Sequence, residues 1–85
     1  DILQDQINIF PNPASTYLII QTPEFLMDRP LEISIYNALG YVVLSETHNS
    51  STSEIRLDLQ TSPGIFWLEI KTGEKVIQKM IEIID

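Results

Sequence analysis

Ile9-Phe10-Pro11-Asn12-Pro13-Ala14 is the stretch around which the chain is organised, and the apolar run Tyr17-Leu18-Ile19-Ile20 follows it almost at once. Pro11 and Pro13 each hold φ near ~−65° and donate no backbone N–H. Each proline also pushes the residue before it toward an extended conformation. A strand ladder cannot continue through such a segment. We therefore predict a rigid corner between two strands, in which the Asn12 side chain supplies turn hydrogen bonds.

Outward from this corner, short runs of alternating apolar and polar residues are separated by turn residues. Alternation with a period of two places successive side chains on opposite faces of a strand. The segments with this pattern are Gln6–Phe10, Thr16–Gln21, Leu31–Asn37, Tyr41–Glu46, Glu54–Leu59, Ile65–Lys71 and Val76–Ile84. Strands repeating at intervals of about ten residues, without a helical period, predict an all-β fold. We expect a seven-stranded antiparallel β-sandwich of the Ig-like type.

The segment Tyr41–Glu46 is partly apolar on both of its expected faces. Strict alternation would place Val42 and Leu44 on one face, and Tyr41 and Val43 on the other. A strand that is apolar on both faces is typical of a position inside a sheet. We therefore expect this strand to be central and to be followed by a polar loop over residues 47–53.

The last two segments are expected to pair as a hairpin through the tight turn at residues 72–75. Ile65–Lys71 is apolar enough for the centre of a sheet. Val76–Ile84 is apolar on both faces, so it lies either inside a sheet or at an edge with one apolar face open to a partner. At an edge, its unpaired backbone groups would be open to an added strand. Lys75 and Lys79 would mark its exposed side, because lysine on an edge strand discourages unwanted pairing.

Two glycines occupy predicted turns. Gly40 ends the turn after Asn37, where a positive φ is expected. Gly64 follows Pro63 in an arrangement typical of a type II turn. The connection at residues 22–30 contains Phe25, Leu26 and Met27, which we expect to cover one end of the core.

Composition excludes several classes of function. The chain has 85 residues, so it is one domain at most, and its net charge of −7 with five basic residues argues against partners such as nucleic acid or anionic lipid. It contains no cysteine, which excludes disulfides and thiolate catalysis. No apolar run is long enough for membrane insertion. Because the chain starts at Asp1 without an initiator Met, we expect it to be a piece of a longer protein, with residues 1–5 ending a linker.

Candidate catalytic and metal-binding residues are sparse. His48 is the one histidine, and no G-x-S-x-G elbow presents a serine to it. The acidic residues are scattered singly and form no calcium loop. We therefore expect no catalytic residue, no metal and no cofactor. Trp67 and the tyrosines could form a sugar-stacking platform, although aromatic residues at alternate strand positions more often fill a core.

Three motifs occur in one order along the chain. They are Ile9-Phe10-Pro11-Asn12-Pro13-Ala14, Ile33-Ser34-Ile35-Tyr36-Asn37-Ala38-Leu39-Gly40-Tyr41-Val42-Val43 and Ser62-Pro63-Gly64-Ile65-Phe66-Trp67-Leu68-Glu69-Ile70. In this order the chain resembles the type A C-terminal sorting domain of the type IX secretion system of Bacteroidota. That family has a YPNP start, a middle hairpin with a glycine, a Gly-x-Tyr strand and a basic, apolar last strand. Here Phe66 replaces the tyrosine, and acidic residues follow the last lysine.

The resemblance implies a function in export. Such a domain directs a larger cargo protein through the outer-membrane translocon, and a sortase-like peptidase then usually removes it. The domain is then a monomeric, non-catalytic address, and its cargo reaches the cell surface or the extracellular space. The recognition residues we expect are Pro11, Asn12, Pro13, Gly40, Gly64, Lys75 and Lys79. The alternative is an Ig-like or fibronectin-like binding module, for carbohydrate or protein, of a secreted enzyme or adhesin.

Overall fold

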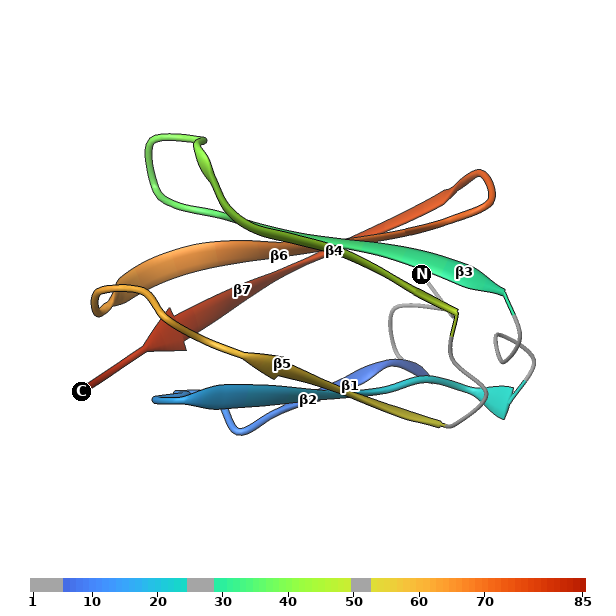
Figure 1. The fold of residues 1–85 in the computed structure, drawn as a ribbon, viewed down its shortest axis with the longest axis horizontal. Helices are drawn as coiled ribbons and strands as arrows, with labels where there is room; N and C mark the ends of the chain where they lie inside the picture. The colour runs from blue at the N-terminus through green and yellow to red at the C-terminus, as the bar shows by residue number, and fades with distance from the viewer. Residues whose placement is uncertain (1–5, 25–28, 50–52) are drawn as a thin grey trace.

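Two antiparallel sheets form the structure, a computed structural model that describes residues 6–24, 29–49 and 53–85. The strands are β1 (Asn8–Phe10), β2 (Tyr17–Gln21), β3 (Pro30–Tyr36), β4 (Val42–Asn49), β5 (Glu54–Asp58), β6 (Gly64–Thr72) and β7 (Lys75–Ile83). One sheet has the order β1-β2-β5 and the other the order β4-β3-β6-β7. The sheets lie one above the other, and β7 crosses obliquely toward the level of the smaller sheet (Figure 1). The predicted seven-stranded antiparallel sandwich is confirmed.

The core lies between the sheets, on the faces that the alternating apolar residues predict. In β3 the buried side chains are Leu31, Ile33 and Ile35, while Glu32 between them is exposed. The same alternation buries every second residue of β5, β6 and most of β7. The buried apolar residues are Ile7, Ala14, Leu18, Ile20, Leu31, Ile33, Ile35, Ile55, Leu57, Leu59, Phe66, Leu68, Ile70, Ile77, Ile81 and Ile83. Strand β6 lies between β3 and β7, so its predicted position inside a sheet is confirmed.

Strand β4 is at the edge of its sheet, and the prediction of a central position was wrong. Its register with β3 shifts beside Tyr36, so that Tyr36 is opposite Val42 and Ile35 is opposite Leu44. Val43 is the extra residue of this bulge. The side chains of the residues before it therefore lie on the opposite face of the sheet from the one that strict alternation predicts. Val42 therefore lies on the outer face and Leu44 packs against the core, whereas strict alternation placed them together. Val42 and Val43, at the start of β4, are 53% and 42% exposed.

The bounds of several predicted segments also change. Strand β1 begins at Asn8 rather than Gln6. Thr47, His48 and Asn49 continue β4, because they pair with β3, so the polar loop that we expected from Thr47 is shorter. Residues 50–52 of that loop lie outside the described residues. The predicted covering of the core by Phe25, Leu26 and Met27 also lies outside them.

The hairpin between β3 and β4 is held by Asn37 and requires Gly40. The Gly40 N–H donates to the Asn37 carbonyl at 2.9 Å, and the Asn37 side-chain Oδ1 accepts from the N–H groups of Leu39 and Tyr41 at 3.0 and 2.9 Å. Gly40 has a φ of 90°, a region that residues with a Cβ rarely adopt. Its predicted positive φ is confirmed.

Gly64 also has a positive φ, but it does not have the geometry of a type II turn. Its φ of 156° differs from the ~+80° of that turn. Gly64 is the first residue of β6, where it pairs with Ile83 of β7. The type II assignment was therefore wrong, and Gly64 instead starts a strand in an extended conformation that favours glycine.

Replacing Gly40 by alanine should lower the free energy of unfolding by roughly 1 kcal/mol, because a side chain at this φ is strained. A Cβ at Gly40 would meet no atom within 4 Å, so the loss has no contribution from a clash. Urea denaturation followed by circular dichroism measures the change. Ala38→Ser, in the same exposed turn, is the control, and equal stability of all three proteins would refute the strained backbone.

Candidate recognition surface

The Pro11–Pro13 corner lies along the free edge of β7. The Asn12 side chain bonds to this strand twice, because its Nδ2 donates to the Met80 carbonyl at 3.4 Å and its Oδ1 accepts from the Glu82 N–H at 3.1 Å. The next contact is a parallel bridge between Ala14 and Ile83. There the Ala14 N–H donates to the Glu82 carbonyl at 2.8 Å, and the Ala14 carbonyl accepts from the Ile84 N–H at 2.7 Å.

These four hydrogen bonds close the C-terminal half of the β7 edge. The groups involved belong to even-numbered residues, whose N–H and C=O point away from β6 because antiparallel neighbours bond at alternate residues. The amide of Asn12 takes the place of a backbone peptide in this ladder. We expected the backbone groups on the outer edge of β7 to be unpaired. From Met80 to Ile84 this was wrong, because Asn12 and Ala14 bond to them. We expected the Asn12 side chain to bond within a local turn. It bonds instead to Met80 and Glu82, which are 68 and 70 residues away in sequence.

Lys79 is also part of this junction. Its residue lies between Ile77 and Ile81 on the inward side of β7, and its Nζ reaches out to donate to the Ile7 carbonyl at 3.0 Å. A long aliphatic stem allows lysine to lie along apolar surface while its ammonium group stays near water. Lys79 is therefore partly buried, which corrects the prediction that it marks an exposed side. Lys75 is exposed, at the start of β7.

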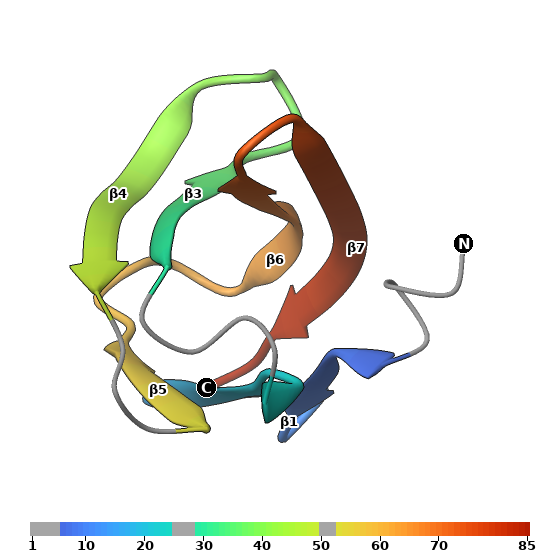
Figure 2. The ribbon, with the colours of Figure 1, turned by 90° about the vertical axis from the view of Figure 1, so that its right-hand side faces the viewer.

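The structure brings some of the expected recognition residues together and separates others. Ile83 bridges to Ala14 and pairs with Gly64, so the Pro11–Pro13 corner and Gly64 lie at one end of the sandwich. The hairpin with Gly40 rises from the larger sheet near the same end, and Lys75 lies in the β6–β7 hairpin at the opposite end (Figure 1). In Figure 2 the C-terminal end of β7 comes down to the level of β1 and β2. The junction of the corner with β7 is therefore the candidate recognition surface.

Replacing Asn12 by alanine should lower the free energy of unfolding by about 1 kcal/mol, since it removes both bonds of the side chain to β7. The edge is accessible to water, which limits the loss. Asn8→Ala, at an exposed position of β1, is the matched control and should change the stability by less than ~0.5 kcal/mol. Equal unfolding free energies for the Asn12 and Asn8 variants would contradict the stabilising role of the amide.

A row of apolar side chains on the outer face of the larger sheet was not predicted. The register places Val42, Tyr36, Trp67 and Met80 opposite one another on β4, β3, β6 and β7. Val42, Trp67 and Met80 are 53%, 46% and 57% exposed, which is unusual for large apolar residues. The residue types were visible in the sequence, but their alignment depends on the strand order and on the bulge in β4.

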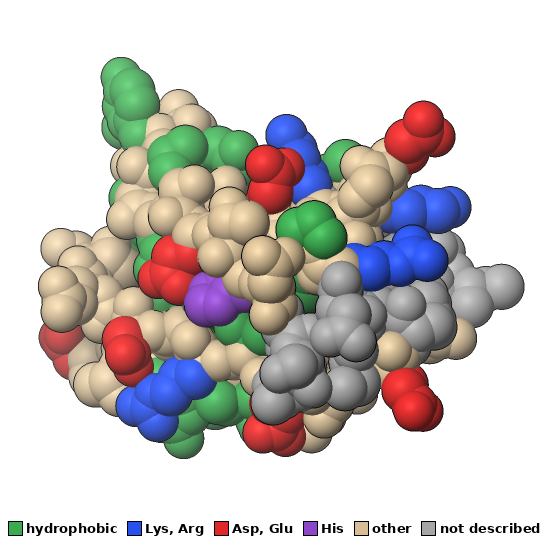
Figure 3. All heavy atoms as spheres, turned by 45° about the vertical axis from the view of Figure 1, so that its right-hand side comes forward, with side chains coloured by type: hydrophobic (Ala, Val, Ile, Leu, Met, Phe, Trp, Pro, Cys, Tyr) green, Lys and Arg blue, Asp and Glu red, His purple; other side chains and the backbone are tan. Residues whose placement is uncertain are grey.

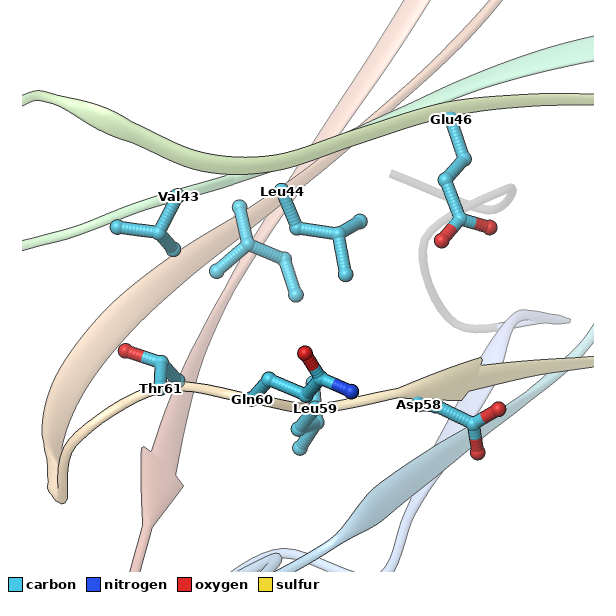
Figure 4. A pocket seen from close by; sticks show the side chains of 8 residues that line it. Val43, Leu44, Glu46, Asp58, Leu59, Gln60 and Thr61 are labelled. Atoms are coloured by element: carbon cyan, nitrogen blue, oxygen red, sulfur yellow. The ribbon is translucent and has the colours of Figure 1, made fainter.

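His48 is paired with a carboxylate of its own strand. Its Nε2 lies 2.7 Å from Glu46 Oε1, and both side chains are partly exposed. A groove of about 420 Å³ lies between β4 and the segment after β5, with Glu46 on one wall and Asp58 on the other (Figure 4). Within residues 6–24, 29–49 and 53–85 no group of three or more His, Cys, Asp or Glu residues could hold a metal ion.

The described part of the chain contains no helix that is both long enough and apolar enough to cross a bilayer.

The structure is a small β-sandwich in which the Pro11–Pro13 corner is hydrogen-bonded to the edge of β7. A row of apolar side chains lies on the outer face of its larger sheet. The family model described as "Secretion system C-terminal sorting domain" matches residues 8–84. The chain belongs to this family, the sorting domains of the type IX secretion system, and the resemblance inferred from the three motifs is confirmed. It is a sorting signal for export to the cell surface or the extracellular space.

A curated relative has a similar segment. The endo-acting ulvan lyase of Formosa agariphila is 28% identical over 82 residues, which cover 94% of this chain and 15% of the lyase. The chain therefore spans a small part of the length of that relative. The similarity is in keeping with a sorting domain that is one part of a larger cargo protein.

Proposed function

We propose that this domain is a passive address, which the type IX translocon recognises and which a sortase-like peptidase then removes from the exported cargo. The observation that carries this proposal is the family match over residues 8–84, which covers nearly the whole chain. The domain then needs neither a catalytic residue nor a cofactor. His48 bonds to Glu46 of its own strand.

The sorting domain comprises residues 1–85, with residues 1–5 as the end of a linker from the cargo. It acts as a monomer and binds neither nucleic acid nor membrane lipid. Its charge of −7 supports this part of the proposal, because phosphate-rich surfaces repel such a domain.

The recognised surface extends from the junction of the corner with β7 to the two ends of the sandwich. Pro11, Asn12 and Pro13 lie on the β7 edge, and Gly64 is the partner of Ile83 at the same end. Gly40 and Lys75 are exposed at hairpins, while Lys79 ties the junction to Ile7. Most of these seven residues therefore shape the recognised surface. Lys75 is the residue best placed to contact the translocon directly.

Lys75→Glu should decrease export of a fused reporter several-fold while the stability of the domain stays within ~0.5 kcal/mol of the wild type. The reason is that Lys75 is exposed, so a reversed charge alters recognition rather than packing. Arg29→Glu, which makes the same change of charge at an exposed residue before β3, is the control. Unchanged export of the Lys75 variant would assign recognition to the Pro11–Pro13 corner and to Gly40 instead.

The two proposed partners, the translocon and the sortase-like peptidase, are tested in host strains that lack one or the other. A reporter that carries residues 1–85 at its C-terminus is expressed in three Bacteroidota strains: wild type, one without the type IX translocon and one without the sortase-like peptidase. We expect export in the wild type and retention without the translocon. Without the peptidase, the reporter should keep the 9.7 kDa of the domain. Export that persists without the translocon would refute the proposed route.

A further inference from the structure

A groove lies on the outer face of the larger sheet, beneath the hairpin that joins β3 to β4. Its volume is about 470 Å³, and its lining includes Tyr36, Asn37, Leu39, Trp67, Glu69 and Gln78. The hairpin rises from the sheet (Figure 1), and hydrophobic side chains stand clear of the surface near its tip (Figure 3). None of these residues belongs to the junction of the corner with β7, so the groove is a separate feature of the domain.

One wall of the groove is aromatic. Trp67 on β6 is directly opposite Tyr36 on β3, so their Cβ atoms are about 5 Å apart and the side chains stand next to each other. Trp67 remains 46% exposed and Leu39 82% exposed. Indole and phenol rings on the solvent side of a sheet present flat apolar surface with a polar group at one end.

The floor of the groove is a rigid hydrogen-bond acceptor. The Glu69 side chain is only 12% exposed, although it lies on the outer face of the sheet. Its Oε1 accepts from the Tyr36 hydroxyl at 3.3 Å and lies 3.7 Å from the Lys71 ammonium group, and its Oε2 accepts from the Gln78 amide at 2.9 Å. Two hydrogen-bond donors and the nearby Lys71 ammonium group therefore fix the carboxylate next to the aromatic wall, while the lone pairs that they leave can accept from a ligand.

We propose that this groove binds a neutral sugar ring. A pyranose has an apolar C–H face, which stacks on Trp67, and hydroxyl groups at its rim, which donate to Glu69 and exchange hydrogen bonds with Gln78. Concave sites that combine aromatic surface with a few fixed polar groups are typical of small-ligand binding.

Charge and desolvation select this class of ligand. An apolar protein side chain over the groove would remove water from the Glu69 carboxylate without replacing its hydrogen bonds, which is unfavourable. A sugar hydroxyl replaces the water with a charge-assisted bond. Uronic or sulfated sugars carry negative charge, and the twelve acidic residues of the chain against five basic ones disfavour them. The site therefore favours neutral sugars over both charged sugars and apolar protein surface.

The single tryptophan of the chain makes the test direct, because Trp67 reports its own environment. The chain is titrated with cellohexaose, xylohexaose and mannohexaose as neutral probes, and with a hexamer of galacturonic acid as the charged probe. We expect a saturable change in tryptophan fluorescence with at least one neutral hexamer and a response at least tenfold weaker with the charged one. The absence of a response to all three neutral hexamers overturns the proposal, as does tighter binding of the charged hexamer.

Matched variants locate the site by isothermal titration calorimetry. Ile65 is on the same face of β6 as Trp67 and is equally exposed, at 46%, but it does not line the groove. Trp67→Ala should raise the Kd of the hexamer that binds at least tenfold, and Glu69→Gln should raise it several-fold, whereas Ile65→Ala leaves it unchanged. Circular dichroism confirms that each variant is folded. Equal binding by the Trp67 and Ile65 variants overturns the assignment to this groove. Binding of an apolar peptide in place of every sugar would overturn it in favour of a protein partner.

Discussion

Leu68→Ala should lower the free energy of unfolding by about 3 kcal/mol, within the range of 2–5 kcal/mol for truncating a buried leucine. Leu68 is 1% exposed and lies on β6, between β3 and β7, with its side chain directed at the smaller sheet. Truncation removes contacts between the two sheets and leaves a cavity that the neighbouring strands can fill only partly. A domain of this size has only ~5–10 kcal/mol of stability, so the loss is a large share of it.

Leu39 provides a matched control for this prediction. It is 82% exposed at the tip of the β3–β4 hairpin, so Leu39→Ala should change the stability by less than ~0.5 kcal/mol. Both variants are compared with the wild type by urea denaturation. Similar losses for the two leucines would contradict the placement of the core between the sheets.

Ala14→Asp should have an effect of similar size, at roughly 3 kcal/mol, because it places a carboxylate in a buried seam. Ala14 is 1% exposed, and both of its backbone groups bond to β7. A charged side chain at this position must either stay buried without a partner or pull the segment away from β7.

Hydrogen exchange distinguishes the seam from the rest of the fold. The N–H groups of Glu82 and Ile84 bond to Asn12 and Ala14, so they should exchange much faster in the Ala14→Asp variant. Ser15→Asp, at the exposed neighbouring position, should leave these amides protected. Equal protection in both variants would refute the closure of the β7 edge by the N-terminal segment.

The local structure of the chain could be predicted because alternation fixes which residues of a strand share a face. In β3 and β5, the apolar residues of the alternating pattern are those that the structure buries. The tight β6–β7 hairpin also follows from its turn residues, since Thr72 pairs with Lys75. In each case the physical cause lies within a few neighbouring residues.

The errors concern properties that depend on distant residues. Strand β4 was expected inside a sheet because its composition is apolar. It lies at the edge, because its position depends on how the strands pair in three dimensions, and composition does not show this. The bulge at Val43 reverses the facing of Val42, and nothing in alternation indicates an inserted residue. Asn12 was correctly singled out as special, yet its partners in β7 are about 70 residues away in sequence. Its contacts therefore required the structure.

The central claim is that this domain by itself directs a cargo to the outside of the cell. It is tested by the fraction of a folded reporter enzyme found outside cells of a wild-type Bacteroidota host, with and without residues 1–85 at its C-terminus. Because the chain belongs to the sorting-domain family over residues 8–84, we predict that the reporter with the domain is exported and the reporter without it stays in the cell. Equal retention of both reporters, with the domain folded, would contradict the account.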